Sequence, residues 1–409
     1  MKRKGVLSDE DFKRLGEENT IDLKEEKEKV QEGLKDCYHT ILDLYKKYGD
    51  MNEIYPPILT CWAIGTYFHR EFNSYPFLFF NAMKSSGKSR ILKLTMDLSL
   101  NGQVNNNMTE AVLFRTTGAL GIDEFEGLSR RGAENLRELL NSAYKKGVKV
   151  RRMKQQKTPE GVEQVVEEFD VYRPLALANI YGMEDVLGDR TIPIILERSN
   201  KISVVNLIEI WEQETEFVKI TTLLRNLNLK GNGVVSCSLL SPGTLYRDWN
   251  KWVLSNNTTT HTNNNTKQQY FFNKITKSEF NGRELEITFP ILIVAQMIGD
   301  DILDGVIKSL SLIIKGKRED QFIESRDVSL IDFVSQSPHI DKYLSVSIMA
   351  REFKDFLQED ESEEKWINAK WVGRALKRLS LVKESRRLGR GREVVLDIEK
   401  AQEKIKMFK

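Results

Sequence analysis

The chain has 409 residues, a net charge of +2 and an ordinary globular composition, with 40% hydrophobic and 30% charged residues, and this length predicts two or three domains. No apolar run approaches the ~20 residues of a membrane-spanning helix, and the charged segment Met1–Val30 lacks the apolar centre of a signal peptide. Three widely spaced cysteines and four histidines argue against a disulfide framework or a structural zinc site, so we expect a cytoplasmic protein that does not contact membranes.

The first half of the chain alternates between segments of helical periodicity and short apolar runs of strand type. Helices are expected at Ser8–Lys47, Ile58–Phe72, Ile91–Leu98 and Glu134–Tyr144. Strands are expected at Phe77–Phe80, Gly102–Asn105, Ala119–Ile122, Val148–Met153, Val165–Val171, Leu175–Ala178 and Thr191–Leu196. Because strands alternate with helices, we predict an α/β fold with a mainly parallel sheet covered on both faces, spanning about Ile54–Arg198.

The segment Phe77–Ser89 (FLFFNAMKSSGKS) joins a buried strand to a helix start, as a P-loop does. Backbone N–H groups of such a loop and the helix N-terminus bind phosphate, Gly87 allows close approach, Lys88 supplies charge and Ser89 ligates Mg²⁺. Ala82 replaces the first glycine of the pattern; it fits if its φ is negative, with some loss of ATP affinity. The expected ATP contacts are Lys84, Ser85, Ser86, Gly87, Lys88, Ser89 and Arg90.

A second buried strand, Ala119–Ile122, ends in Asp123 and Glu124. Asp123 lies 35 residues after Lys88. We expect Asp123 to order the Mg²⁺ shell and Glu124 to polarise the attacking water. Solvated carboxylates at a strand end are the alternative, but the pair at this distance from a P-loop favours an ATPase. The strand near Gly102–Asn105 suggests a sheet in which another strand separates the two motif strands.

The rest of the chain is mainly helical. Val205–Val253 predicts helix with a break near Gly231–Gly233, Ser255–Gln269 predicts a flexible insertion, and Pro290–Ile314 predicts another helix. We therefore divide the chain into an N-terminal helical segment (1–53), an ATPase core (54–200), a helical lid or linker (201–344) and a C-terminal module (345–409).

The C-terminal module has the pattern of a winged helix. Lys365–Lys409 holds 14 Lys and Arg against 5 Asp and Glu, a net charge of +9, as expected of a module that contacts nucleic acid. Two helices, Val346–Leu357 and Ala369–Leu379, precede a wing with a turn at Gly389–Gly391; the first should bury Ile348, Phe353, Phe356 and Leu357. DNA contacts are expected from Lys370, Arg374, Lys377, Arg378, Arg387 and Arg390. A protein-docking module or a solvated tail is the alternative.

The order of these motifs resembles the AAA+ helicase-like ATPases of plasmids, viruses and other mobile elements, which are distantly similar to the minichromosome maintenance helicases. The resemblance covers about Ile54–Arg198 and, more loosely, the segments that follow. It is carried by Cys61-Trp62-Ala63, the phosphate loop, Thr109–Arg115, the strand ending in Asp123-Glu124, Leu139–Ser142, the strand ending in Asn179, and Gly188-Asp189-Arg190.

The resemblance implies roles for four further residues. Asn179 would be the sensor-1 residue near the γ-phosphate, although an asparagine that begins a turn fits the same pattern. Arg190 would be an arginine finger that reaches the ATP of the neighbouring subunit, with Arg198 as its rival. Arg283 is a candidate sensor-2 residue, or else a structural arginine. Because a finger supplied in trans requires a ring, the resemblance implies a homo-hexamer.

The resemblance also places a hairpin of the ring channel at Lys145–Lys157, which holds seven basic residues and no acidic one. Arg152, Lys154 and Lys157 are the expected contacts to a single DNA strand. The alternative is a solvated loop whose charge is balanced by Glu160, Glu163, Glu167 and Glu168.

We therefore expect an ATP- and Mg²⁺-dependent DNA helicase or translocase that acts as a ring in mobile-element replication. An ATP-switched initiator or loader that binds DNA without unwinding it has the same motifs. A DNA-binding protein with a residual nucleotide site is disfavoured because Lys88, Ser89, Asp123 and Glu124 are all present. No acidic catalytic cluster precedes the core, so primase activity is not expected.

Overall fold

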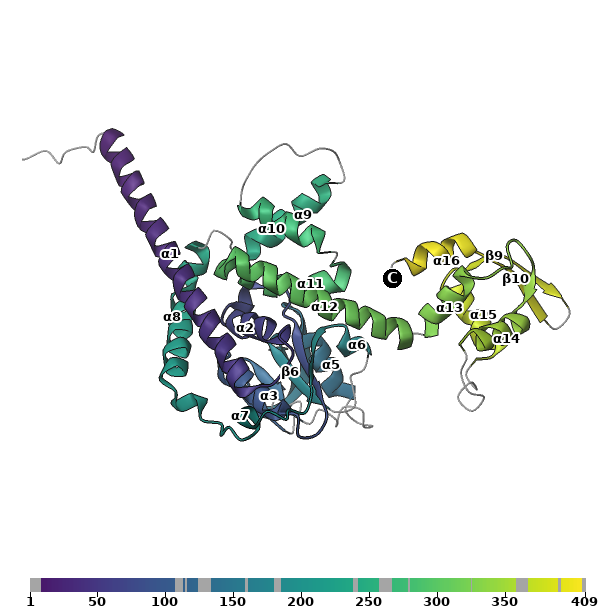
Figure 1. Ribbon diagram of the computed structural model, residues 1–409, viewed down its shortest axis with the longest axis horizontal. Helices are drawn as coiled ribbons and strands as arrows, with labels where there is room; N and C mark the ends of the chain where they lie inside the picture. The colour runs from purple at the N-terminus through teal and green to yellow at the C-terminus, as the bar shows by residue number, and fades with distance from the viewer. Residues whose placement is uncertain are drawn as a thin grey trace, which may run out of the picture. The chain divides into compact units, whose positions relative to one another are not determined.

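The computed structural model describes residues 9–106, 113–114, 116–123, 134–158, 161–179, 185–237, 242–256, 267–278, 280–324, 326–357, 367–388 and 391–406. The chain forms two compact units, Met1–Leu312 and Ile313–Lys409 (Figure 1). Within the described ranges, no helix combines the length and the apolar character needed to cross a membrane.

A five-stranded parallel sheet forms the centre of the first unit. Its order is β2-β3-β6-β1-β7, and every neighbouring pair is parallel. The strands are β1 (Phe77–Ala82), β2 (Gln103–Asn105), β3 (Leu120–Ile122), β6 (Leu175–Asn179) and β7 (Thr191–Leu196). β1, β3 and β6 are buried almost throughout, as a sheet covered on both faces requires, whereas β2 at one edge is half-buried to exposed. As predicted, a strand (β6) separates β1, which precedes the phosphate loop, from β3, which precedes Asp123.

Helices before and between the strands cover this sheet. They include α1 (Asp9–Tyr48), α2 (Tyr55–Gly65), the 3-10 helix η1 (Thr66–Glu71), α3 (Lys88–Asp97), α5 (Glu134–Ala143) and α6 (Asp185–Gly188). α3 packs against β1, β3 and β6, and α2 packs against α1 and α11. The single helix predicted at Ile58–Phe72 changes to 3-10 geometry after Gly65. Tyr75 donates a hydrogen bond to the carbonyl of Trp62 there, and it leaves no room for a side chain at Gly65.

The second part of the first unit is helical, as expected. It contains α7 (Ile202–Val205), η3 (Trp211–Gln213), α8 (Thr215–Cys237), α9 (Pro242–Asn256), α10 (Lys267–Lys277) and α11 (Gly282–Ile298), followed by α12 (Asp300–Glu324). The predicted break near Gly231–Gly233 is wrong, because α8 continues to Cys237. The predicted helix Pro290–Ile314 is two helices: an Asn281–Glu284 capping box starts α11 earlier, and α11 ends before Gly299. Residues 257–266 of the predicted insertion lie outside the described residues.

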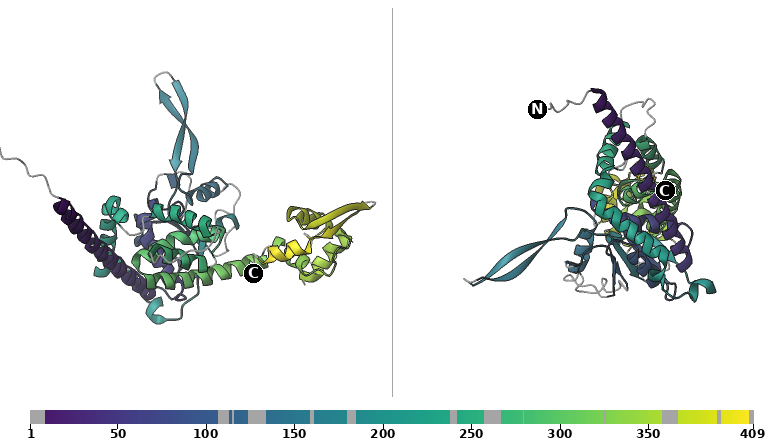
Figure 2. Two further views of the ribbon diagram at one scale, coloured as in Figure 1. Left: turned by 90° about the horizontal axis from the view of Figure 1, so that it is seen from above. Right: turned by 90° about the vertical axis from the view of Figure 1, so that its left-hand side faces the viewer.

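Two long strands, β4 (Lys149–Thr158) and β5 (Gly161–Asp170), form a separate antiparallel hairpin. Figure 2 shows it projecting away from the body of the first unit. Both strands are longer than predicted, because polar pairs such as Gln155 opposite Gln164 extend the ladder beyond the apolar residues that the sequence pattern detects.

The second unit contains α13 (Arg326–Ser335), β8 (Leu344–Ser345), α14 (Val346–Leu357), α15 (Ala369–Arg378), β9 (Val382–Leu388), β10 (Gly391–Leu396) and α16 (Ile398–Ile405), with sheet order β8-β10-β9. One core runs from Val328 to Ile405. Phe353 is buried as predicted, but Ile348 and Phe356 are 40% and 37% exposed. The buried stripe of α14 is Val346, Met349, Ala350 and Phe353, which follows the i, i+3, i+4, i+7 spacing that the predicted set does not.

Candidate nucleotide site and nucleic-acid surfaces

The phosphate loop occupies the turn from β1 into α3. Ala82 ends β1 in register with Leu196 and does not have a positive φ, which is the condition for tolerating alanine there. Gly87 has φ 81° at the N-cap of α3, a left-handed conformation that favours glycine. A cavity of ≈ 480 Å³ lies along the loop and is lined by all seven predicted ATP contacts, Lys84, Ser85, Ser86, Gly87, Lys88, Ser89 and Arg90.

Lys88 and Asp123 meet in this cavity. Lys88 Nζ lies 3.8 Å from Asp123 Oδ1, and the two side chains are only 10% and 12% exposed. The backbone N–H of Asp123 donates to the carbonyl of Asn105 at 3.1 Å, which fixes the residue after β3. A low-exposure cation and carboxylate can therefore exchange their mutual contact for a phosphate and a metal ion. Glu124, the next residue, lies outside the described residues.

The other predicted residue at this edge of the sheet is Asn179. It ends β6 in register with Asn81 of β1 and is 5% exposed. The carboxyl ends of β1, β3 and β6 thus bring the phosphate loop, Asp123 and Asn179 to one edge. Asn179 is not among the residues that line the cavity.

The residues of the loop fit a nucleoside triphosphate with Mg²⁺. Ser86 Oγ is buried and makes no hydrogen bond to the described part of the chain, so the loop has an unused hydrogen-bonding group. Ser89 lines the cavity together with Asp123, and Mg²⁺ is usually held by one or two protein oxygens, with water and phosphate completing its shell. Within the described ranges, no three His, Cys, Asp or Glu side chains gather into a metal site of another kind.

Sequence reasoning missed the rest of the cavity. Tyr48, Gly49 and Asp50, at and after the end of α1, line it, as do residues of the segment Leu196–Glu209. Asp50 accepts hydrogen bonds from Lys201 Nζ and Ser199 Oγ, both at 2.7 Å. The Lys201 contact, and then the Ser199 contact, lowers the pKa of Asp50 against a smaller effect of burial. These segments are far from the phosphate loop in sequence and have no motif that signals the contact.

Arg90 is directed at the same segment. Its guanidinium donates to the carbonyl oxygens of Val204 at 2.7 Å and Leu207 at 2.9 Å, and its Nε lies 3.4 Å from Glu209 Oε1. Its described contacts are therefore with the segment that follows β7, on the wall of the cavity.

Arg190 lies at the opposite edge of the sheet from the phosphate loop. It directly precedes β7, and its carbonyl accepts from Phe77 N–H at the start of β1. With Arg283 it lines a second cavity of ≈ 470 Å³, where the two guanidinium groups lie 5.8 and 5.3 Å from the ring centre of Tyr144. Burial, and then repulsion from Arg283, lowers the pKa of Arg190. Arg198 instead follows β7, at the phosphate-loop edge, and is exposed.

Basic residues of β4 in the hairpin form ion pairs with acidic residues of β5. Glu168 pairs with Lys149 at 2.9 Å and with Arg151 at 3.0 Å, and Lys154 pairs with Glu167 at 2.6 Å. The predicted balancing acids are therefore in contact with part of the basic segment. Arg152 lies 5.8 Å from the ring centre of Phe114, and the Lys157 backbone pairs with Val162, one position before the Thr158–Gly161 end.

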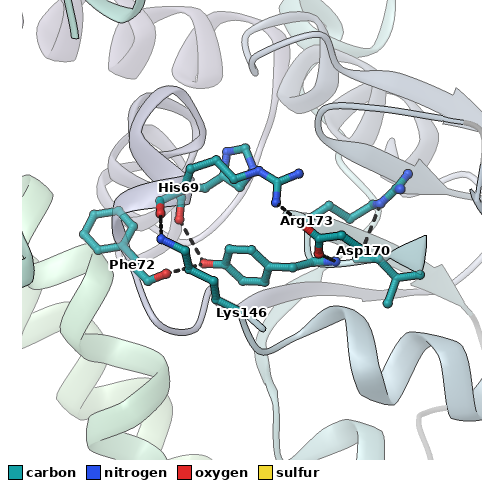
Figure 3. A network of polar contacts seen from close by, with 8 residues as sticks. His69, Phe72, Lys146, Asp170 and Arg173 are labelled. Atoms are coloured by element: carbon teal, nitrogen blue, oxygen red, sulfur yellow. Dashed lines mark hydrogen bonds and ion pairs between the residues drawn. The ribbon is translucent and has the colours of Figure 1, made fainter. Parts of the chain in front are cut away.

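The base of the hairpin is tied to η1 by polar contacts (Figure 3). Arg70 pairs with Asp170 at 2.6 Å, Lys146 Nζ donates to the carbonyl of Arg70, and the Tyr172 hydroxyl lies within hydrogen-bonding distance of the His69 and Phe72 carbonyls. Burial raises the pKa of Asp170, but the contacts with Arg70 and the Tyr172 N–H outweigh it and the net pKa is lowered. These contacts anchor the base of the hairpin to the first unit.

In the second unit the predicted basic residues lie on α15 and β9. Lys370, Arg374, Lys377 and Arg378 are all exposed on one helix. Arg378 pairs with Asp327 of α13 at 2.6 Å, and Arg386, which was not among the predicted contacts, pairs with Glu393 and lies 3.9 Å from the Tyr343 ring centre. Arg387 is exposed opposite Arg392, whereas Arg390 lies outside the described residues.

Comparison with known proteins shows distant similarity at the level of solved structures. No protein-family profile and no curated protein matches the chain. Among solved structures, the chain is similar to JCV helicase, solved with a bound thiazolopyridine-phenoxyphenyl acetamide. The identity is 15% and the TM-score 0.25, over 61% of this chain and 73% of that one. A TM-score this low identifies neither the fold nor the function.

Proposed function

We propose that the protein is an ATP-dependent DNA helicase or translocase. The observation that carries the proposal is the pairing of Lys88 with Asp123 at one edge of the parallel sheet, inside a cavity lined by the phosphate loop. A basic loop at a helix N-terminus favours phosphate, and an acidic strand end beside it can hold the divalent cation that a bound triphosphate brings.

The roles follow from the chemistry of each group. Lys84–Ser89 bind the phosphates, Ser89 and Asp123 hold Mg²⁺, and Glu124 is the general base for the attacking water. When held by Ser89 and Asp123, Mg²⁺ would supply the charge neutralisation that phosphoryl transfer requires. Asn179 is positioned at the same edge of the sheet, where its amide can orient the water.

Arg190 is proposed to act on ATP bound by a second subunit. A strand of six residues, about 17–20 Å long at ~3.3 Å per residue, separates Arg190 from the phosphate loop. Arg190 therefore cannot contact the nucleotide of its own chain, whereas a head-to-tail ring brings opposite edges of neighbouring subunits together. This is the basis for proposing a ring, and the resemblance implies that the ring is a homo-hexamer.

DNA contacts are proposed for the hairpin and for the second unit. Arg152, Lys154 and Lys157 would contact a single strand. The exposed basic face of α15 and the β9–β10 wing, read as a winged helix, would contact duplex. The ion pairs of Lys149, Arg151 and Lys154 with Glu167 and Glu168 favour a second candidate, an initiator or loader, because they reduce the charge that the hairpin offers to a moving strand.

A forked-DNA unwinding assay beside an ATPase assay, with and without single-stranded DNA, tests the proposal. We expect hydrolysis stimulated by single strands and unwinding that requires ATP. Lys88→Ala should remove nucleotide binding, and Glu124→Gln should bind ATP without turnover. Hydrolysis and DNA binding without unwinding would select the initiator or loader, and turnover near the normal rate in Glu124→Gln would remove Glu124 from the mechanism.

A further inference from the structure

The segment Ile202–Glu214, here called the strap, follows β7 and borders the phosphate-loop cavity before α8 begins. Val204, Val205 and Glu209 of the strap line that cavity. Val205 is 52% exposed although apolar, so it offers uncovered apolar surface to the cavity. Phosphate contacts come from the loop, which leaves the strap as a surface for the non-phosphate part of a ligand.

Arg90 holds the cavity-lining part of the strap. Its side chain is only 20% exposed, and its guanidinium contacts two carbonyl oxygens and one carboxylate, at 2.7, 2.9 and 3.4 Å. A planar guanidinium can reach these acceptors simultaneously, because its donors diverge in a fixed fork. A lysine ammonium keeps the charge but lacks that fork.

The far end of the strap is held by other residues. Trp211 Nε1 donates to Asp97 at 2.9 Å, Lys93 pairs with Glu212 at 3.1 Å, and the Trp211 ring packs edge-on against Tyr48 with centroids 4.9 Å apart. These contacts do not involve Arg90. Loss of Arg90 therefore releases chiefly the part of the strap that lines the cavity.

We propose that Arg90 is a positioning residue, which holds the strap as the wall that binds the nucleoside half of ATP. Val204 and Val205, with Leu196, provide apolar contacts for a planar base, while the loop contacts the phosphates. Arg90 then controls ATP affinity through the strap and not through charge on a phosphate. This inference depends on the proposed nucleotide site.

The test compares ATP with inorganic tripolyphosphate, which has the phosphates and no nucleoside. Titration calorimetry of the full chain with Mg²⁺ measures both affinities. Arg90→Ala and Arg90→Lys should each weaken ATP binding about tenfold, equivalent to about 1.4 kcal/mol, and change tripolyphosphate binding less than about twofold. Lys88→Ala, the matched control on the same helix, should weaken both ligands.

Equal loss of both ligands, or full ATP affinity in Arg90→Lys, would mean that Arg90 acts by charge on the phosphates and would overturn the proposal. Unchanged ATP affinity in both Arg90 variants would overturn it as well. Failure of the unmodified protein to bind either ligand would instead remove the nucleotide site, and with it this role of Arg90.

Discussion

Ala82 occupies the position where the P-loop pattern has its first glycine. It is the last residue of β1, paired with Leu196, and it is 6% exposed with no positive φ. Glycine is favoured where φ is positive or the backbone must approach a ligand. In this loop Ser85 (φ 63°) and Gly87 (φ 81°) have a positive φ, and Ala82 does not. The methyl group of Ala82 therefore packs into the sheet.

Ala82→Gly, which restores the full pattern, should not improve ATP binding. We expect affinity within about twofold of the original, and a loss of about 0.5–1 kcal/mol in the free energy of unfolding, because glycine loses more backbone conformational freedom on folding than alanine. Calorimetric titration and denaturant unfolding measure the two quantities. A gain in affinity of tenfold or more would show that the methyl group obstructs the loop.

The phosphate side of the candidate site is predictable from sequence and the other side is not. Lys88 and Asp123 stand in local motifs, each a strand followed by a characteristic turn, so their neighbourhood is encoded within a few residues. Tyr48 and Val204 reach the same cavity through tertiary packing of α1 and the strap, for which one sequence contains no local signal. Glu124 follows from the same motif as Asp123 but is placed by sequence alone.

Among the secondary-structure elements, buried strands were the easiest to predict. The apolar run Thr191–Leu196 has the bounds of β7, because burial on both faces leaves a continuous apolar segment. The hairpin strands were predicted too short, since a solvent-exposed two-stranded ribbon needs no apolar alternation at its far end. The sequence predicts one helix at Ile58–Phe72 and gives no sign of the change to 3-10 geometry after Gly65, because the close contact of Gly65 with Tyr75 depends on tertiary packing.

The anchor of the hairpin contains a buried histidine. His69 is 6% exposed, and its Nδ1 lies 2.7 Å from the carbonyl of Thr66. Burial lowers the pKa of His69 from 6.5 to about 4; the Thr66 contact opposes this shift, while Arg70 and Arg173 add to it. The unfolded chain therefore binds a proton that the folded chain rejects. The contribution of neutral His69 to the free energy of unfolding is fully present above pH 6.5 and is lost as the pH falls toward 4.

The free energy of unfolding should thus fall by about 1.3 kcal/mol between about pH 7.5 and 5.5 because of His69 alone. His69→Gln should remove this part of the pH dependence, whatever its effect on absolute stability. His39→Gln, at an exposed histidine of α1, is the control for replacing a histidine by glutamine outside the hairpin anchor. Equal slopes for the original protein and His69→Gln would show that His69 is not the titrating group.

Removing charge at two positions along the hairpin tests whether its basic residues contact DNA or are only solvated. Lys154→Ala with Lys157→Ala should leave basal ATP hydrolysis intact, abolish its stimulation by single-stranded DNA, and lower the salt slope of single-strand binding by about 1.4. Lys149→Ala with Arg151→Ala removes the same charge nearer the base and should change the slope less. Lys154 pairs with Glu167 as these two residues pair with Glu168, so the two double variants differ in position along the hairpin. Equal effects of the two pairs would indicate a diffuse electrostatic surface.

At the scale of the whole molecule, the candidate site residues of the first unit lie at two edges of its sheet. The phosphate loop and Asp123 follow the carboxyl ends of their strands, while Arg190 precedes the amino end of β7, next to a cavity that it shares with Arg283 and Tyr144. Two guanidinium groups beside one ring repel each other, and their cavity favours an anion. A single subunit holds its phosphate site at the other edge, so the arrangement favours an assembly of several copies.

Subunit mixing tests whether the two edges cooperate between chains. Arg190→Ala and Lys88→Ala subunits are each expected to be inactive, but about a quarter of the interfaces in a random equal mixture pair an intact phosphate loop with an intact Arg190. Mixing should therefore restore a measurable fraction of ATP hydrolysis. Arg198→Ala mixed with Lys88→Ala is the control, because Arg198 lies at the phosphate-loop edge of its own chain, where a role in cis allows no rescue. Rescue confined to the Arg198 mixture, in assemblies shown to exchange subunits, would assign the finger to Arg198 and leave Arg190 with a structural role.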